Sequence, residues 1–322
     1  MPVAPLCFDV FNGDADGICA LHQLRLHEPQ AAQLVTGVKR DNTLLRHLAG
    51  VRDARIVVLD ISLERNREYL VPLLDFCTVF YADHHFAGDI PASPRLEAHI
   101  DPSPDVCTAF IIDRLLGGRF RKWAVVAAFG DNLYEIAHQT ARELGLAETG
   151  TAILRELGEL MNYNGYGKTV ADLHCHPAAL YEAVHPFSDP FDFAADSLVI
   201  PRLREGFQGD MAAAAAIRPE VDTPSGRVFS FPAESWARRV AGVFSNDKAR
   251  EMPDRAHALL VDNNDNTSMV SVRAPFARPN GADTLCRAFP TGGGRMAAAG
   301  INALPNEMIE QFLKSFHEVF AP

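Results

Sequence analysis

The chain has 322 residues, of which 48% are apolar and 22% are charged, and its formal net charge is −11. This composition is typical of a globular protein, and the length favours two domains over one. The acidic balance argues against a basic surface that tracks long nucleic acid, and it favours a small anionic substrate held by metal ions and a few arginines.

The first half of the chain alternates apolar strands with helices. We expect strands at residues 6–11, 33–38, 55–61 and 78–82, and helices at residues 16–27, 43–48 and 63–74. Strands that alternate with helices predict a parallel sheet covered on both faces. The first domain is therefore predicted to be a doubly wound α/β domain.

The remainder is predicted to hold a helical extension, a linker and a second domain. Helices are expected at 108–116, 123–129, 134–144 and 152–161, followed by a helix over 194–216 and a turn at 219–226. Strands at 227–231, 256–261 and 269–273, the last two forming a hairpin, accompany helices at 234–244, 284–289 and 306–320. We expect a first domain at 1–185, a linker at 186–218 and a smaller α/β domain at 219–322.

Acidic and histidine residues follow the predicted strands. The segment Asn12-Gly-Asp14-Ala-Asp16-Gly17 joins a strand to a helix, at the sheet edge where such folds place ligands. Aspartates two residues apart can offer oxygens to two different hard cations, although capping of the following helix is the simpler explanation of this motif taken alone. Asp60 ends the apolar strand 55–61 and has the same two interpretations.

Two further motifs strengthen the case for a metal site. Asp83-His84-His85 follows the strand at 78–82, and it offers two imidazoles together with a carboxylate that can orient one of them. Asp131 ends an apolar helix. Four such motifs, each at the end of an element, form a pattern that structural roles alone do not explain.

These motifs resemble those of the DHH superfamily of phosphoesterases, and the resemblance spans nearly the whole chain. The superfamily includes RecJ exonucleases, nanoRNases, dinucleotide phosphodiesterases and exopolyphosphatases. The first motif is similar to the segment around Asp14 and Asp16, the second to Leu59-Asp60, the third to Asp83-His84-His85 and the fourth to Gly130-Asp131. The C-terminal half resembles the DHH-associated substrate domain.

The resemblance implies two Mn²⁺ ions, with Mg²⁺ as the alternative. Asp60 would bridge them, Asp14 would hold one, and Asp16, His84 and Asp131 would hold the other. His85 and Arg273 would bind the phosphoryl oxygens, and Asp83 would orient a histidine. A water bound between the ions would attack phosphorus.

The C-terminal half also has a phosphate-binding pattern of its own. Gly292, Gly293 and Gly294 can turn backbone N–H groups toward one anion, and the neighbouring Arg295 supplies a fixed positive charge. A simple turn between two elements is the alternative. The resemblance implies that Arg295 and this loop hold the terminal phosphate of the substrate.

Two residues depart from the resemblance. Many members carry a histidine or an acid as a metal ligand just before the first aspartates, where this chain has Asn12. Many also have a histidine at the position of Arg295. These departures favour a weaker first metal site and an altered substrate preference.

We therefore expect a manganese-dependent hydrolase that cuts short linear oligonucleotides or dinucleotides to mononucleotides. An exopolyphosphatase or similar small-phosphate hydrolase is one alternative, and a catalytically weakened binding or regulatory module is another. No apolar run is long enough for a membrane helix, and the N-terminus lacks a basic region, so we expect a cytoplasmic protein without a signal peptide. The six cysteines form no C-x-x-C pair and are expected to be reduced.

Overall fold

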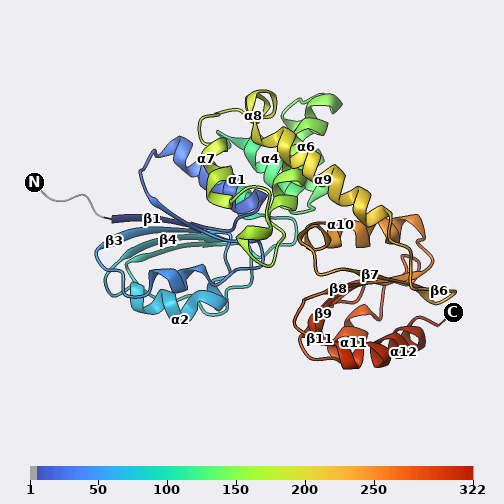
Figure 1. Ribbon diagram of the computed structural model, residues 1–322. Helices are drawn as coiled ribbons and strands as arrows, with labels where there is room; N and C mark the ends of the chain where they lie inside the picture. Colours follow the sequence, from blue (N-terminus) through green and yellow to red (C-terminus); the bar gives the residue numbers. More distant parts are fainter. Residues whose placement is uncertain (1–5, 322) are drawn as a thin grey trace, which may run out of the picture. The chain divides into compact units, whose positions relative to one another are not determined.

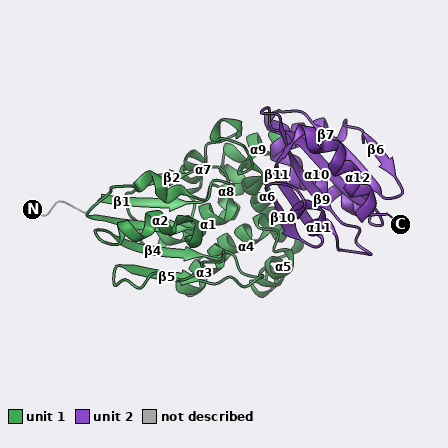
Figure 2. Cartoon of the chain, turned by 90° about the horizontal axis from the view of Figure 1, so that it is seen from below, with its two compact units in different colours: residues 1–206 green, residues 207–322 purple. Residues whose placement is uncertain are grey.

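The computed structural model describes residues 6–321 and divides into two compact units, Met1–Gly206 and Phe207–Pro322 (Figure 2). The boundary lies inside the segment 186–218 that separates the two predicted domains. The first five residues, on which the expectation of no signal peptide partly depends, lie outside the described part. Within that part, no helix combines the length and the apolar character that crossing a membrane requires.

Unit 1 is built on a five-stranded sheet in the order β2-β1-β3-β4-β5, and every neighbouring pair is parallel. The strands are β1 (Leu6–Phe11), β2 (Gln33–Thr36), β3 (Ala54–Leu59), β4 (Thr78–Asp83) and β5 (Leu96–Ile100). Helices α1 (Ala15–His27) and α7 (Pro177–Val184) lie on one face, and α2 (Leu63–Leu73) lies on the other with the 3-10 turn η1 (Leu44–Leu48) (Figure 1). The predicted doubly wound parallel sheet is confirmed.

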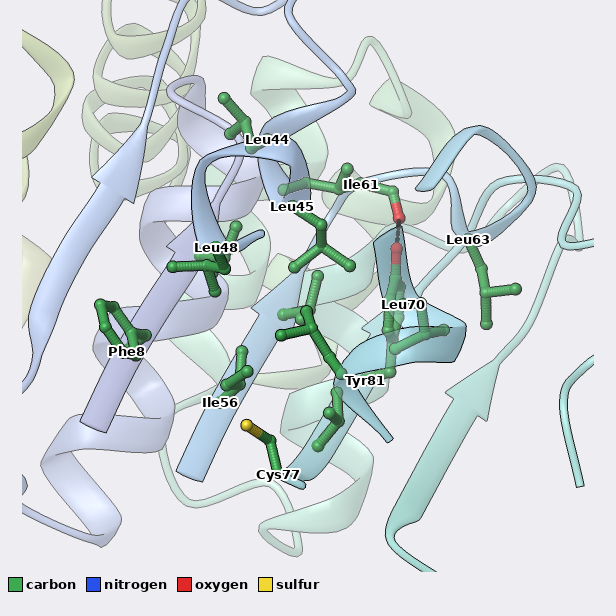
Figure 3. Packing of buried hydrophobic residues seen from close by; sticks show 14 of the residues in the cluster. Phe8, Leu44, Leu45, Leu48, Ile56, Ile61, Leu63, Leu70, Cys77 and Tyr81 are labelled. Atoms are coloured by element: carbon green, nitrogen blue, oxygen red, sulfur yellow. Dashed lines mark hydrogen bonds between the residues drawn. The ribbon is translucent and has the colours of Figure 1, made fainter. Parts of the chain in front are cut away.

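The face under α2 is a continuous apolar cluster (Figure 3). Alternate residues of the central strands, such as Ile56 and Val58 of β3, meet Leu70 of α2 there. The single polar group of Tyr81 is satisfied inside this cluster, because its hydroxyl donates to the Ile61 carbonyl at 2.8 Å (Figure 3). Burial on both faces explains why the central strands appear in the sequence as unbroken apolar runs.

The helical extension of unit 1 follows the sheet. It contains α3 (Thr108–Leu115), α4 (Arg121–Gly130), α5 (Tyr134–Glu143), α6 (Glu148–Asn164) and α8 (Pro190–Asp196), with the turn η2 (Val170–Asp172) before α7. Helices α4 and α6 cross closely, since a β-carbon added to Gly158 would lie 2.2 Å from the Val126 carbonyl oxygen and 2.8 Å from the Gly130 nitrogen. This contact fixes the end of α4, where Asp131 lies.

Two expectations about local structure in this half differ from the structure, and one strand was not predicted. The single helix expected over 194–216 is two helices, α8 and α9 (Val199–Ala215), because Ser197 is extended and its hydroxyl caps α9 by accepting from the Val199 N–H at 3.3 Å. Phe193 of α8 is buried against Trp123, so the first part of the expected linker belongs to the core of unit 1. Strand β5 was missed because its polar residues interrupt the apolar pattern.

Unit 2 holds a six-stranded mixed sheet in the order β10-β11-β9-β8-β7-β6. The strands are β6 (Val221–Thr223), β7 (Gly226–Phe231), β8 (Ala256–Asp262), β9 (Thr267–Arg273), β10 (Gly292–Arg295) and β11 (Ala298–Pro305). Helix α10 (Ser235–Glu251) covers one face, and α11 (Ala282–Arg287) and α12 (Ile309–Val319), the latter preceded by the turn η3 (Asn306–Met308), cover the other (Figure 1). The predicted hairpin of β8 and β9 is confirmed.

The expected glycine-rich loop is a strand. β10 pairs antiparallel with β11 at the edge of the sheet, so the prediction of an open loop is wrong. Close packing requires glycine at two of its positions. A β-carbon at Gly292 would lie 1.8 Å from the Cys286 carbonyl oxygen, and one at Gly294 would lie 2.5 Å from Ala299 Cα. β6 likewise occupies part of the turn expected at 219–226.

Candidate metal centre

The carboxyl ends of β1, β3 and β4 meet at one edge of the sheet of unit 1, because these strands are parallel neighbours. The acidic and histidine residues predicted from the sequence gather there with the start of α1 and the end of α4. They are Asp14, Asp16, Asp60, Asp83, His84, His85 and Asp131.

His84 is held in one orientation. Its Nδ1 lies 2.9 Å from the Val106 carbonyl oxygen, which only accepts, so Nδ1 carries the proton and Nε2 keeps its lone pair. Nε2 lies 3.5 Å from Asp60 Oδ1 and 3.4 Å from Asp131 Oδ2. This is the arrangement of an imidazole prepared to bind a cation between two carboxylates.

His85 is paired with Asp83. Its Nδ1 lies 2.7 Å from Oδ1 of the fully buried Asp83. Burial alone would lower the pKa of His85, but the hydrogen bond to Asp83 and the charges of Asp83, Asp131 and Asp16 together outweigh it and raise that pKa. The other ring nitrogen, Nε2, is left for a ligand, since the His85 side chain remains 45% exposed.

Two overlapping groups of side chains could hold a metal ion. Asp60, His84 and His85 form one, and Asp16, His84 and Asp131 form the other; in each, the ligand atoms lie within 4.8 Å of one another. Both groups share His84, and carboxylate and imidazole ligands suit Mn²⁺. The donor set therefore fits a divalent cation.

The fold fixes the carboxylates of Asp16 and Asp60 in the metal centre. The Asp16 carboxylate accepts from the backbone N–H groups of Thr108 and Ala109 at the start of α3, both at 2.7 Å. Asp60 adopts a left-handed backbone with φ of 59°, a strained conformation that the surrounding structure must maintain. Burial, followed by the charges of Asp16 and Asp14, raises the pKa of Asp60 well above its usual range, and a bound cation would relieve this cost.

Asp14 differs from the other predicted ligands. Its Oδ1 caps α1 by accepting from the Asp16 and Gly17 N–H groups, both at 3.1 Å. Its Oδ2 lies 2.5 Å from the Nζ of Lys39. The helix-capping interpretation therefore applies to Asp14, whereas its role as a metal ligand stays a prediction.

Lys39 is the site residue that sequence reasoning missed. Its ammonium also contacts Asp131 Oδ1 at 2.9 Å and Asn162 Oδ1 at 2.8 Å. A lone lysine has no recognisable pattern, but it follows β2, which lies beside β1, so its loop is at the ligand edge of the sheet. Burial would lower the pKa of Lys39, but the carboxylates of Asp131 and Asp14 hold it well above its usual range.

In unit 2, Arg273 and Arg295 are each paired with Ala298 of the strand between them. Residues opposite each other across a sheet point to the same face, and two strand spacings amount to about 10 Å. Arg295 is exposed, whereas Arg273 is anchored by donating to Asn246 Oδ1 at 2.8 Å and to Ser271 Oγ at 3.0 Å. Their expected roles toward phosphate stay predictions.

No protein-family model matches the chain, and no curated protein matches it in sequence. Among solved structures, exonuclease RecJ bound to manganese aligns with 98% of this chain and 90% of its own, at 16% identity and a TM-score of 0.62. A DHH-domain protein assigned to a family of ribosomal proteins aligns with 98% of this chain and 86% of its own, at 13% identity and a TM-score of 0.60.

The pGpG-specific phosphodiesterase PggH from Vibrio cholerae aligns with 98% of both chains, at 12% identity and a TM-score of 0.56. These structures share both α/β units with the present chain along nearly its whole length. The chain thus has the two-domain fold of the DHH proteins, as its motifs predicted.

Proposed function

We propose that this chain is a DHH-superfamily phosphoesterase that uses a divalent cation to hydrolyse short linear oligonucleotides or dinucleotides to mononucleotides. The observation that carries the proposal is the orientation of His84, whose Nε2 faces Asp60 and Asp131 while its Nδ1 is bound to a backbone carbonyl. Such a fixed imidazole, between the buried Asp60 and the partly buried Asp131, suits a metal ligand. Manganese is the preferred ion and magnesium the alternative.

Four residues would hold the cation: Asp16, Asp60, His84 and Asp131. When bound, a divalent cation acts as a Lewis acid that lowers the pKa of water and draws charge from a phosphoryl oxygen. Hydrolysis breaks the bond between phosphorus and the leaving oxygen and forms a bond from phosphorus to the water oxygen. The fold supplies the rigidity that this chemistry needs, because Thr108 and Ala109 hold Asp16 in place.

His85 is proposed to bind the substrate phosphoryl group. The Asp83 carboxylate fixes the ring through Nδ1 and favours its protonated form, so Nε2 can donate a hydrogen bond to a phosphoryl oxygen. Negative charge that develops on that oxygen in the transition state strengthens the contact.

An exposed aromatic side chain supports a nucleotide substrate over polyphosphate. Phe86 directly follows His85 and is 68% exposed. A nucleobase can stack on such a ring, and stacking contributes roughly 1–3 kcal/mol per base. Polyphosphate has no base and would leave this apolar ring unused.

Unit 2 is proposed to bind substrate phosphate through Arg295, on the same sheet face as Arg273. Arg295 is exposed and has a fixed charge suited to a phosphate group. The acidic balance of the chain also favours a short substrate over a long nucleic acid. The six cysteines, none of which forms a disulfide in the described part of the chain, agree with the cytoplasm as the proposed compartment.

Two alternatives rest on specific residues. Polyphosphate hydrolysis needs only the metal centre and the arginines. A binding or regulatory module is suggested by Asn12, where many relatives are expected to carry a histidine or an acid, and by Arg295, where many are expected to carry a histidine. The purified protein should be tested with Mn²⁺ against pGpG, pAp, cyclic dinucleotides and polyphosphate. We expect mononucleotides from pGpG, with a lower rate on the other substrates.

A Phe86→Ala variant sharpens that experiment. Loss of stacking should raise KM for pGpG about tenfold and leave any hydrolysis of polyphosphate unchanged. Cleavage of polyphosphate in preference to pGpG by the parent would reject the nucleotide assignment. A parent that binds these ligands but hydrolyses none of them would favour the regulatory module.

A further inference from the structure

The ammonium group of Lys39 occupies a position built to receive it. An ammonium has three N–H donors, and three oxygens surround this one: Asp14 Oδ2 at 2.5 Å, Asp131 Oδ1 at 2.9 Å and Asn162 Oδ1 at 2.8 Å. The ring of Tyr166 lies 5.8 Å away and adds a cation–π contact. Every donor of the ammonium is therefore satisfied within the protein.

The backbone of Lys39 is fixed as well. Its N–H donates to the Gly165 carbonyl at 2.8 Å, and its carbonyl accepts from the side-chain amide of Asn12 at 3.3 Å. The side chain is only 22% exposed. A lysine held at both ends is part of the architecture of the site rather than a mobile surface charge.

The carboxylates around Lys39 define two positions that a positive charge can occupy, one beside Asp14 and one beside His84. Asp131 directs Oδ1 toward Lys39 and Oδ2 toward His84 Nε2, 3.4 Å away. Asp14 has no oxygen free of a contact, because Oδ1 caps α1 and Oδ2 meets Lys39. The His84 side of Asp131 suits a metal ion, whereas the Asp14 side already holds a cation.

Asn12 explains why the Asp14 side suits lysine better than metal. The resemblance to DHH proteins places a metal-binding histidine or acid at this position, and a neutral amide is a poor replacement. The Asn12 amide instead donates to the Lys39 carbonyl and so helps to hold the lysine. Asn12 therefore lacks the group that would bind a metal ion, and Lys39 supplies a positive charge in its place.

We propose that the Lys39 ammonium is the permanent cation on the Asp14 side, so that this centre binds one divalent ion instead of two. The inference rests on the proposed metal-dependent function, and it replaces the two-ion arrangement that the resemblance implied. The two groups of candidate ligands share His84, whose Nδ1 is already bound to the Val106 carbonyl, so they offer one ion alternative positions beside Nε2, which faces Asp60 and Asp131. Asp14 becomes the partner of a lysine rather than a metal ligand.

Metal counting tests this directly. The parent protein, dialysed free of metal, should be titrated with Mn²⁺ by calorimetry and its bound manganese measured after removal of free ion. We expect one ion in the parent and two in the double variant Asn12→His, Lys39→Met, which restores an imidazole and removes the ammonium. Lys122→Met, which removes a lysine paired with Asp189 elsewhere in unit 1, is the matched control and should bind one.

Each outcome has a distinct meaning. Two ions in the parent would overturn the inference, because Lys39 must then leave its position when metal binds. One ion in the folded double variant would also overturn it, because the position would not be one that accepts metal. No binding in the parent would overturn the proposed metal function and this inference together.

Electron paramagnetic resonance of the Mn²⁺-loaded parent supplies a test that needs no variant. A single ion gives the six-line signal of isolated Mn²⁺, and its intensity should rise in proportion to bound metal up to one equivalent. A signal broadened by spin coupling between two neighbouring ions would contradict the proposal even if the double variant failed to fold.

Discussion

The close crossing of α4 and α6 predicts that a single methyl group will disturb the metal centre. A β-carbon at position 158 would lie 2.2 Å from the Val126 carbonyl oxygen, so reaching an ordinary 3.4 Å contact requires the helices to separate by about 1.2 Å (3.4 − 2.2). Overpacking of this kind costs roughly 1–3 kcal/mol, and replacing glycine in a helix recovers up to about 1 kcal/mol. For Gly158→Ala we expect a net loss of about 1 kcal/mol, from about 2 kcal/mol of overpacking less about 1 kcal/mol of helix propensity.

The same shift should weaken metal binding. Asn162 lies one helical turn beyond Gly158 in α6, and Asp131 directly follows α4, so separating the helices moves both of these Lys39 partners. Denaturant unfolding gives the stability, and Mn²⁺ titration gives the affinity. Gly150→Ala is the control in the same helix, because a β-carbon there would lie 3.4 Å from the Phe191 ring. A Gly158→Ala protein with the stability and Mn²⁺ affinity of Gly150→Ala would refute this reasoning.

Three further predictions concern pH, substrate and metal. Burial lowers the pKa of His22 to about 4 from its usual 6.5, so stability from its neutral form is complete above pH 6.5 and lost as the pH falls toward 4. Between pH 7 and pH 5 the parent should lose about 2 kcal/mol of folding stability through His22. Denaturant unfolding at the two pH values should show that His22→Gln lacks this loss. Arg295→Ala should reduce kcat/KM on pGpG about tenfold more than on unphosphorylated GpG, while Arg250→Ala, which removes another exposed arginine of unit 2, affects neither selectively. Asn12→His alone should leave the Mn²⁺ count at one, because Lys39 still fills the position.

Failure of each prediction has a specific meaning. An unchanged pH dependence in His22→Gln would mean that other groups dominate the acid loss. Equal losses on pGpG and GpG would remove the terminal-phosphate role from Arg295. A second ion in Asn12→His would show that the missing ligand, rather than the lysine, limits metal binding.

The sheet and its motifs could be predicted because their signals are local. A strand buried on both faces is a run of apolar residues, and a carboxylate directly after it lies at the ligand edge whatever the rest of the fold does. Asp60 and Asp83 were found in this way. The edge strands β5 and β10 lacked that signal, since one is half exposed and the other is three glycines and an arginine.

Lys39 could not be predicted because its role depends on residues scattered along the chain. Its partners come from three separate elements: Asp14 at the start of α1, Asp131 at the end of α4 and Asn162 in α6. No spacing in the sequence connects them. The environment of His22 also depends on a distant residue: its Nε2 lies 2.7 Å from the Phe187 carbonyl oxygen, and the side chain is buried.

The effect of losing a metal ligand depends on what the fold places in the vacated position. Taken alone, Asn12 indicates a weakened metal site and thus favours a regulatory module over an enzyme. The structure pairs it with Lys39, whose ammonium neutralises the same carboxylates that the missing ion would have neutralised. A covalently attached charge does not dissociate at low metal concentration, so activity would depend on the free concentration of one ion to the first power. Asn12 therefore does not count against catalysis, and the metal dependence of the rate becomes the property that separates this centre from a two-ion phosphoesterase.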